Sequence, residues 1–284
     1  MKAARFDYLR PASVEEALSA LAAGGPSGRL IAGSQSLGPM LNLRLARPTL
    51  LIDIARLEAL RTVTESHEGL RIGAGVTHAE IEDGRHPLLR DHPWQRVAGT
   101  IAYRSVRNRG TVGGSLAHAD PAADWMLVAW ACEAQIEIAR VAGSRLVPVS
   151  DFMQAAYTTA LAADEMIVAV HLPSALARAG WGYYKVCRKV GDFAEASCAV
   201  LFDAQSGRSR IVIGALDGPP VSLDSLARAL AQDRRAPSDE AIADALSLSP
   251  VASDPIARRM FTATVSRAIA RALGTDHHRE VELA

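Results

Sequence analysis

The sequence is poor in cysteine, and this limits the structures it can build. Its 284 residues include three cysteines, and no two of them stand in a C-x-x-C spacing. Three isolated cysteines cannot form a fully paired disulfide framework, and an iron–sulfur cluster usually takes four thiolates. We therefore expect neither a disulfide scaffold nor an iron–sulfur cluster held by this chain.

The chain also lacks an excess of charge and any long apolar run. Basic and acidic side chains number 31 each, so no global positive field exists to hold a nucleic acid, and none is expected as a partner. The longest uncharged apolar stretch near the middle, residues 125–132, is shorter than the roughly 20 residues that cross a bilayer. Asp7 stands where a secretion signal would have its apolar core. The sequence thus predicts no membrane span and a cytoplasmic location.

What is present suffices for two modest domains, since 49% of the residues are hydrophobic and 22% are charged. Strand and helix patterns interleave up to Pro173, which predicts an α+β domain over residues 1–173. Its lobes are expected at about 1–56 and 57–173. The predicted helices are 13–23, 93–102 and 121–131, and the predicted strands are 29–32, 50–54, 70–74, 135–139, 145–149 and 166–172.

The pattern changes after Pro173. Three consecutive strand-like runs predict an antiparallel three-stranded sheet, and three helical segments follow it. We expect a small second domain over residues 174–284, with a tail after Gly274 that does not pack. The strands are 181–188, 196–202 and 210–215, with a turn at 203–207, and the helices are 223–231, 238–248 and 254–273.

Two glycine-containing loops are the best candidates for a binding site. They read Ala32-Gly33-Ser34-Gln35-Ser36 and Gly110-Thr111-Val112-Gly113-Gly114-Ser115. Small residues let several backbone N–H groups approach phosphate oxygens, and hydroxyl groups add donors. Two such loops could hold a diphosphate from both sides. The alternative, for either loop taken alone, is an ordinary structural turn.

Other segments carry weaker signals. Gly73-Ala74-Gly75-Val76-Thr77-His78 approaches a G-x-G-x-x-G fingerprint, but histidine replaces the third glycine, so we expect a turn that leads into a helix with a Thr77/Glu80 capping box. In His118-Ala119-Asp120-Pro121-Ala122-Ala123-Asp124 a metal site is less favoured than a helix cap by Asp120. Asp124 could accept hydrogen bonds from a ligand hydroxyl.

The arginines before the second loop leave three alternatives open. Arg107 and Arg109 could face phosphate, lie in solvent or anchor a partner protein. No nucleophile site is evident, because Ser36 lacks the G-x-S-x-G context. The sequence therefore predicts a binding function for the loops and no catalytic acid, base or nucleophile.

Four motifs in order resemble one family, the FAD-binding medium subunits of molybdenum hydroxylases such as carbon monoxide dehydrogenase and xanthine dehydrogenase. The resemblance covers nearly the whole chain. Its motifs appear here as Ala32 to Ser36, Arg107 to Gly114 with Asp120-Pro121-Ala122-Ala123-Asp124, Tyr157 to Leu161, and Lys185 to Ala194.

The resemblance implies a two-lobed FAD-binding domain of the vanillyl-alcohol-oxidase-like (PCMH) type and a small C-terminal flavoprotein domain. It implies that both loops hold the diphosphate of an extended FAD. By position, the implied cofactor contacts are Ala32, Gly33, Ser34, Gln35, Ser36, Ile101, Gly110, Thr111, Val112, Gly113, Gly114, Asp124, Ile167, Lys185 and Phe193. For Phe193 the alternatives are an aromatic shield over the flavin ring and a core phenylalanine.

Two positions depart from the family pattern. Ser34 stands where a second glycine is usual, and if the backbone there needs a positive φ, serine costs on the order of 1 kcal/mol. Val112 replaces isoleucine and keeps a β-branched side chain, so we expect little change.

The function that the resemblance implies is electron transfer. A large subunit with the molybdenum cofactor would oxidise the substrate, and a small subunit with [2Fe-2S] clusters would relay the electrons. FAD in this chain would take them from the small subunit and pass them to an external acceptor. A dimer of heterotrimers is the implied assembly. Two alternatives are a free-standing FAD-dependent oxidase or reductase and a flavin-free scaffold subunit, the latter supported only by Ser34.

Overall fold

The structure, a computed structural model, describes residues 2–174 and 179–275, and the chain within it divides into two compact units. The first unit takes the chain up to Asp120 and again from Glu133 to Ser174, and the second takes Pro121–Cys132 and the chain from residue 179 on. The helix predicted at 121–131 therefore belongs to the second unit, whereas the sequence placed it in the first domain. The tail expected to be unpacked lies largely outside the described residues.

The first unit begins with a small parallel sheet in the order β1 (Asp7–Leu9), β3 (Leu50–Asp53), β2 (Gly28–Ile31). Helix α1 (Val14–Gly24) starts behind Ser13, whose side chain accepts a hydrogen bond from the Glu16 amide. Its buried face packs on this sheet through Leu18 and Leu21. The short helix α2 (Leu37–Asn42) follows the first glycine loop.

The second part of the first unit is built on a five-stranded antiparallel sheet. Its order is β4 (Val63–Ser66), β5 (Gly69–Gly73), β10 (Met166–Pro173), β6 (Gln135–Arg140), β7 (Gly143–Pro148). Met166 and Val168 of β10 join the core cluster of α1, so the two parts share buried apolar side chains. The remaining elements are η1 (Gly25–Ser27), η2 (Glu58–Leu60), η3 (Pro87–Leu89), α3 (His78–Glu82), α4 (Pro93–Thr100), α5 (Arg104–Arg107), α6 (Val112–His118), α8 (Val149–Phe152), β8 (Met153–Ala155) and β9 (Thr158–Thr159).

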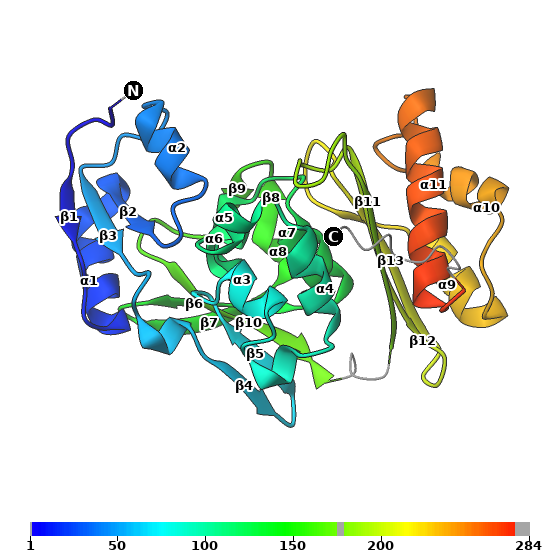
Figure 1. The fold of residues 1–284 in the computed structure, drawn as a ribbon, viewed down its shortest axis with the longest axis horizontal. Coiled ribbons are helices and arrows are strands. Elements are labelled where there is room, and N and C mark those ends of the chain that lie inside the picture. Colours follow the sequence, from blue (N-terminus) through cyan, green and yellow to red (C-terminus); the bar gives the residue numbers. More distant parts are fainter. Residues whose placement is uncertain (1, 175–178, 276–284) are drawn as a thin grey trace. The chain divides into compact units, whose positions relative to one another are not determined.

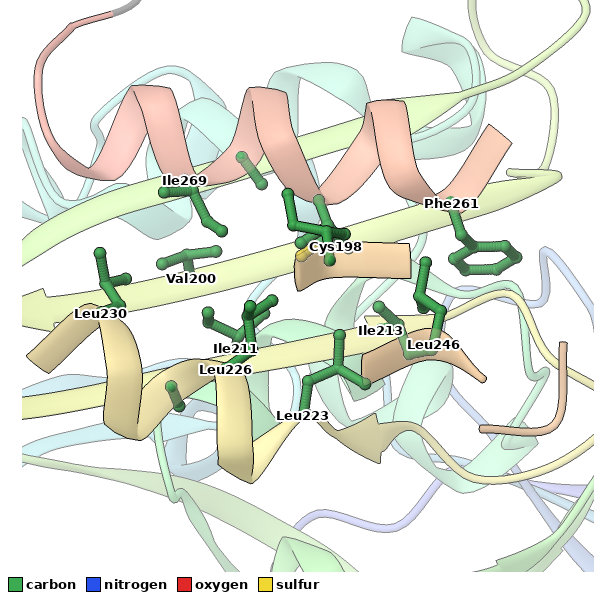
Figure 2. Close-up of a cluster of buried hydrophobic side chains, with 14 of the residues drawn as sticks. Cys198, Val200, Ile211, Ile213, Leu223, Leu226, Leu230, Leu246, Phe261 and Ile269 are labelled. Atoms are coloured by element: carbon green, nitrogen blue, oxygen red, sulfur yellow. The ribbon is translucent and has the colours of Figure 1, made fainter. Parts of the chain in front are cut away.

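The second unit is an antiparallel sheet, and its three C-terminal helices lie on one face (Figure 1). The three predicted strands are β11 (Gly180–Val186), β12 (Ala196–Asp203) and β13 (Arg208–Gly214), and a two-residue strand that the sequence did not predict, β14 (Val221–Ser222), follows them at the edge. Side chains alternate between the two faces of a strand, so Cys198 and Val200 of β12 lie on the same face. They belong to a cluster of buried hydrophobic side chains that residues of the helices complete, and Figure 2 shows this cluster in close-up. The helices are α9 (Asp224–Asp233), α10 (Asp239–Leu246) and α11 (Pro255–Ala272).

Helix α7 (Asp124–Ala131) covers the other face of this sheet. The side chains of Trp125, Leu127 and their neighbours are buried on all sides of the helix. Leu127 would lie 3.4 Å from a Cβ on Gly214. The residue before Gly214, Ile213, faces the apolar cluster on the opposite side of the sheet. The predicted cap by Asp120 is wrong, because α7 begins at Asp124 behind Ala123 and no side chain caps it. A turn at Pro121 and Ala122, followed by the extended residue Ala123, separates Asp120 from the helix.

No helix within residues 2–174 and 179–275 is both long and apolar enough to cross a membrane.

Candidate cofactor site

The first glycine loop presents a run of backbone donors without partners. It leaves β2 at Ile31 and enters α2 at Leu37, and Ser34 adopts a left-handed backbone with φ 63°. Within the described chain, the amides of residues 33–37 make no hydrogen bond. Successive N–H groups around a left-handed residue form a concave site for an anion. This loop therefore has the chemistry that a phosphate requires.

The second glycine loop is tied to the protein instead. Its Val112 and Gly113 amides donate to the carbonyls of Val76 (3.1 Å) and Ala74 (2.9 Å). Thr111 caps α6 by accepting from the Gly114 amide. These bonds fix the loop on the turn at residues 73–78, where the predicted Thr77/Glu80 capping box is present. Most of the amides of this loop are thus committed to the protein.

The two loops meet directly, although far apart in the chain. A Cβ on Gly33 would lie 1.9 Å from the carbonyl oxygen of Arg109 and 2.9 Å from the Cα of Gly110. On Gly113 it would lie 2.5 Å from the Ala74 side chain. The sequence pattern predicts that these glycines allow a ligand to approach the backbone. The structure gives another reason for glycine at these two positions, because the backbone there packs directly against other residues of the chain.

The two arginines before the second loop have different roles. Arg107 is internal: its guanidinium forms two bonds to Glu82 (2.8 and 2.9 Å) and donates to the carbonyls of Ile101 and Ala102, and its side chain is 13% exposed. This excludes the phosphate-facing, solvated and partner-anchoring alternatives for Arg107. Through its bonds to the two carbonyls, the Arg107 side chain also holds the segment that follows α4, where Ala102 has a φ of 45°. Arg109, in contrast, donates through Nε to the carbonyl of Gly33 (3.1 Å).

Two apolar candidates, Ile101 and Ile167, also belong to the first unit. Ile101 is partly buried at the end of α4. Ile167 is 5% exposed and lies at an irregularity in the pairing of β10 with β6. Its neighbour Val168 accepts a hydrogen bond from Ala74, which in turn accepts from Gly113. This chain of backbone bonds fixes Ile167 relative to the second loop.

Asp124 and Lys185 lie together in the second unit. The Lys185 Nζ is 2.8 Å from Asp124 Oδ1, and the Tyr183 hydroxyl donates to the same oxygen. Both charged side chains are 9% exposed. Burial, and then the Asp124 charge, raise the pKa of the Tyr183 phenol well above its usual value. The other oxygen, Oδ2, has no hydrogen-bond partner among the described residues.

Tyr183 was missing from the sequence-based site. The available signal was its spacing of two from Lys185 in a predicted strand, which places both side chains on one face. Phe193 lies between β11 and β12 and is 66% exposed. The alternative that it is a core phenylalanine is therefore wrong. Within the described chain, no group of three or more His, Cys, Asp or Glu side chains is arranged to hold a metal.

Comparison with known proteins identifies the family. A family model described as the FAD binding domain in molybdopterin dehydrogenase matches residues 4–175. The nicotine 6-hydroxylase medium subunit of Paenarthrobacter nicotinovorans is 37% identical over 252 residues, which cover 88% of this chain and 84% of that one. The chain belongs to the FAD-binding medium subunits of the molybdenum hydroxylase family.

Other relatives agree with this membership. The carbon monoxide dehydrogenase medium chain of Hydrogenophaga pseudoflava is 39% identical over 202 residues, 69% of each chain. A crystal structure of carbon monoxide dehydrogenase from the same organism aligns with a TM-score of 0.87 at 33% identity, over 97% of this chain and 99% of that one. Quinoline 2-oxidoreductase from Pseudomonas putida 86 aligns with a TM-score of 0.84 at 31% identity, over 97% and 99%.

As a medium subunit, this chain is the FAD-binding component of an oxidoreductase that contains several subunits. The expected α+β fold is confirmed by these structural neighbours. The two alternatives, a free-standing flavoenzyme and a flavin-free scaffold, are not favoured.

Proposed function

We propose that the first glycine loop binds the FAD diphosphate through the amides of residues 33–37, and that Thr111 and Gly114 of the second loop complete the site. The supporting observation is that the amides of residues 33–37 have no partner in the described chain, whereas those of Val112, Gly113 and Gly114 do. A Cβ on Gly114 would meet only the Thr111 side chain, at 2.8 Å. The remaining members of the two loops, Ala32, Gly110, Val112 and Gly113, shape the site by packing.

The same proposal assigns the other contacts. Ile101 and Ile167 pack against the cofactor. Asp124 accepts from a ribityl or ribose hydroxyl through Oδ2, while Tyr183 and Lys185 hold Oδ1. Phe193 is 66% exposed on its loop and is not part of the core, and its ring covers one face of the flavin. Bound FAD supplies the redox chemistry, and the protein positions and tunes it.

We further propose the path of the electrons. A small subunit with [2Fe-2S] clusters delivers them to this chain, which passes them to an external acceptor, and a large subunit with the molybdenum cofactor oxidises the substrate. The chain has three cysteines, Cys132 and Cys198 being buried, so the clusters belong to another polypeptide. A dimer of such heterotrimers in the cytoplasm is the proposed assembly.

The experiment is purification of the complex through a tag on this chain. We expect two further polypeptides, with iron, molybdenum and FAD, and an absorption spectrum in which FAD stays with this chain after the subunits are separated. Substrate oxidation should require all three polypeptides. Turnover by this chain alone, or a colourless chain, would contradict the proposal.

A further inference from the structure

The carbonyl oxygen of Gly33 accepts hydrogen bonds from two side chains, one in each loop region. Gln35 Nε2 donates to it at 3.0 Å, and Arg109 Nε donates at 3.1 Å. A carbonyl oxygen has two lone pairs, so both are used. The two hydrogen bonds hold the carbonyl in one direction, one from its own loop and one from the opposing loop. We call this pair of hydrogen bonds the clamp.

The clamp also fixes the direction of the next amide. In a planar trans peptide the C=O and the following N–H point to opposite sides. The Gly33 carbonyl is held toward the side chains of Gln35 and Arg109, so the Ser34 N–H points away from them. That amide belongs to the run of donors without partners at residues 33–37.

We infer that Arg109 and Gln35 are positioning residues that keep the Gly33–Ser34 peptide with its amide, and not its carbonyl, toward the diphosphate. This inference rests on the proposed function of the loop. In the opposite orientation the carbonyl would direct its negative end at the phosphates, and the loop would lose one donor. Each clamp acts through the Gly33 oxygen, so Arg109 affects the anion without touching it.

Two substitutions of Arg109 distinguish the effect of its hydrogen bond to the Gly33 carbonyl from the effect of its charge. In Arg109→Gln the new Nε2 occupies the same place along the side chain as the arginine Nε, so the hydrogen bond is kept and the charge is lost. In Arg109→Met a methyl carbon occupies that place, and both are lost. Gln35→Met removes the second clamp in the same way. Arg29→Ala is the control, because Arg29 also donates to backbone carbonyls, those of Pro26 and Gly28, in the same part of the unit.

The test is titration of the flavin-free full chain with FAD, followed by fluorescence, with the thermal midpoint of each flavin-free variant recorded. We expect Arg109→Met and Gln35→Met each to weaken FAD binding roughly tenfold, as for loss of one hydrogen bond. Arg109→Gln should bind within about twofold of the original chain, as should Arg29→Ala. Loss of this one hydrogen bond should lower the thermal midpoint of Arg109→Met by only a few degrees relative to Arg109→Gln, so both flavin-free variants remain folded during the titration.

Other outcomes overturn the inference. Equal losses in Arg109→Gln and Arg109→Met, with binding kept in Arg109→Lys, would mean that the charge contacts phosphate directly. Unchanged FAD binding in Arg109→Met would mean that the clamp has no role, and if that variant does not fold, Gln35→Met answers the same question. Failure of the unsubstituted chain to bind FAD would instead contradict the proposed function.

Discussion

The ammonium group of Lys185 lies 2.8 Å from a carboxylate oxygen of Asp124, 61 residues earlier in the chain. The pair joins β11 to α7, and each side chain is 9% exposed. Removing one partner of a buried pair leaves a charge that neither water nor a counter-ion compensates. The stability of the second unit should therefore depend on this pair.

Lys185→Met should lower the free energy of unfolding by about 3 kcal/mol, because Asp124 would remain buried with only the Tyr183 hydroxyl. Urea unfolding measures the change. Lys189→Met is the matched control, since Lys189 is 67% exposed and lies 3.9 Å from Asp192. It should cost less than about 0.5 kcal/mol. Equal effects for the two substitutions would show that the buried pair has no special role.

Gly33→Ala should separate the two loops. The added carbon would lie 1.9 Å from the Arg109 carbonyl oxygen, and the atom in its way is backbone. We expect a loss of about 2 kcal/mol or more in unfolding free energy and a large loss of FAD affinity. Gly218→Ala is the control, because a Cβ there meets nothing within 4 Å. An alanine at position 33 without any effect would contradict the contact between the loops.

Ser34→Gly should stabilise the chain slightly. Serine at φ 63° is strained, and glycine removes the strain, for a net gain of up to about 1 kcal/mol after its larger loss of backbone entropy. Ser34→Val should cost about 1 to 2 kcal/mol, because a β-branched residue tolerates this conformation least. Thermal unfolding of both variants tests the order. Destabilisation by glycine would show that the Ser34 hydroxyl contributes more than the strain removes.

His92 should make the chain less stable in mild acid. Its Nδ1 accepts from the Trp94 amide at the start of α4, and burial lowers its pKa to about 4. An unfolded histidine, with a pKa near 6.5, takes up its proton first as the pH falls. The free energy of unfolding should therefore decrease between pH ~6.5 and pH ~4, on the order of 1 to 3 kcal/mol, and level off below.

The control for this prediction is His92→Ser, which keeps a capping oxygen and does not titrate. Urea unfolding at several pH values should show a smaller loss in the variant over that window. The difference between the two curves isolates His92 from the carboxylates and from His86, whose pKa burial also lowers. Parallel curves would contradict the assignment.

Features set by neighbouring residues were predictable from the sequence. The Thr77/Glu80 capping box is present because it needs only four consecutive residues. Strands such as β12 were found because their apolar runs are continuous. Short elements such as β14 and α5 carry too few residues for a pattern to emerge.

Features set by distant residues were not predictable. Tyr183 binds Asp124 across 59 positions, and no spacing in the sequence indicates that bond. The glycine pattern indicated the loops but not that Gly33 packs on Arg109, since the pattern is the same whether a glycine faces ligand or backbone. For Arg107 the sequence leaves three alternatives open, because its partner Glu82 is 25 positions away.

Helix α7 has a consequence for how the protein is made. Its buried apolar residues need β12 and β13, yet the ribosome delivers α7 first and then returns to the first unit for residues 133–174. Until Gly214 has emerged, the nascent chain carries an apolar helix with no sheet to cover it. Segments of this kind are where newly made chains aggregate or recruit chaperones. Because Pro121–Cys132 lies between the two segments of the first unit, no single cut of the chain separates the two units.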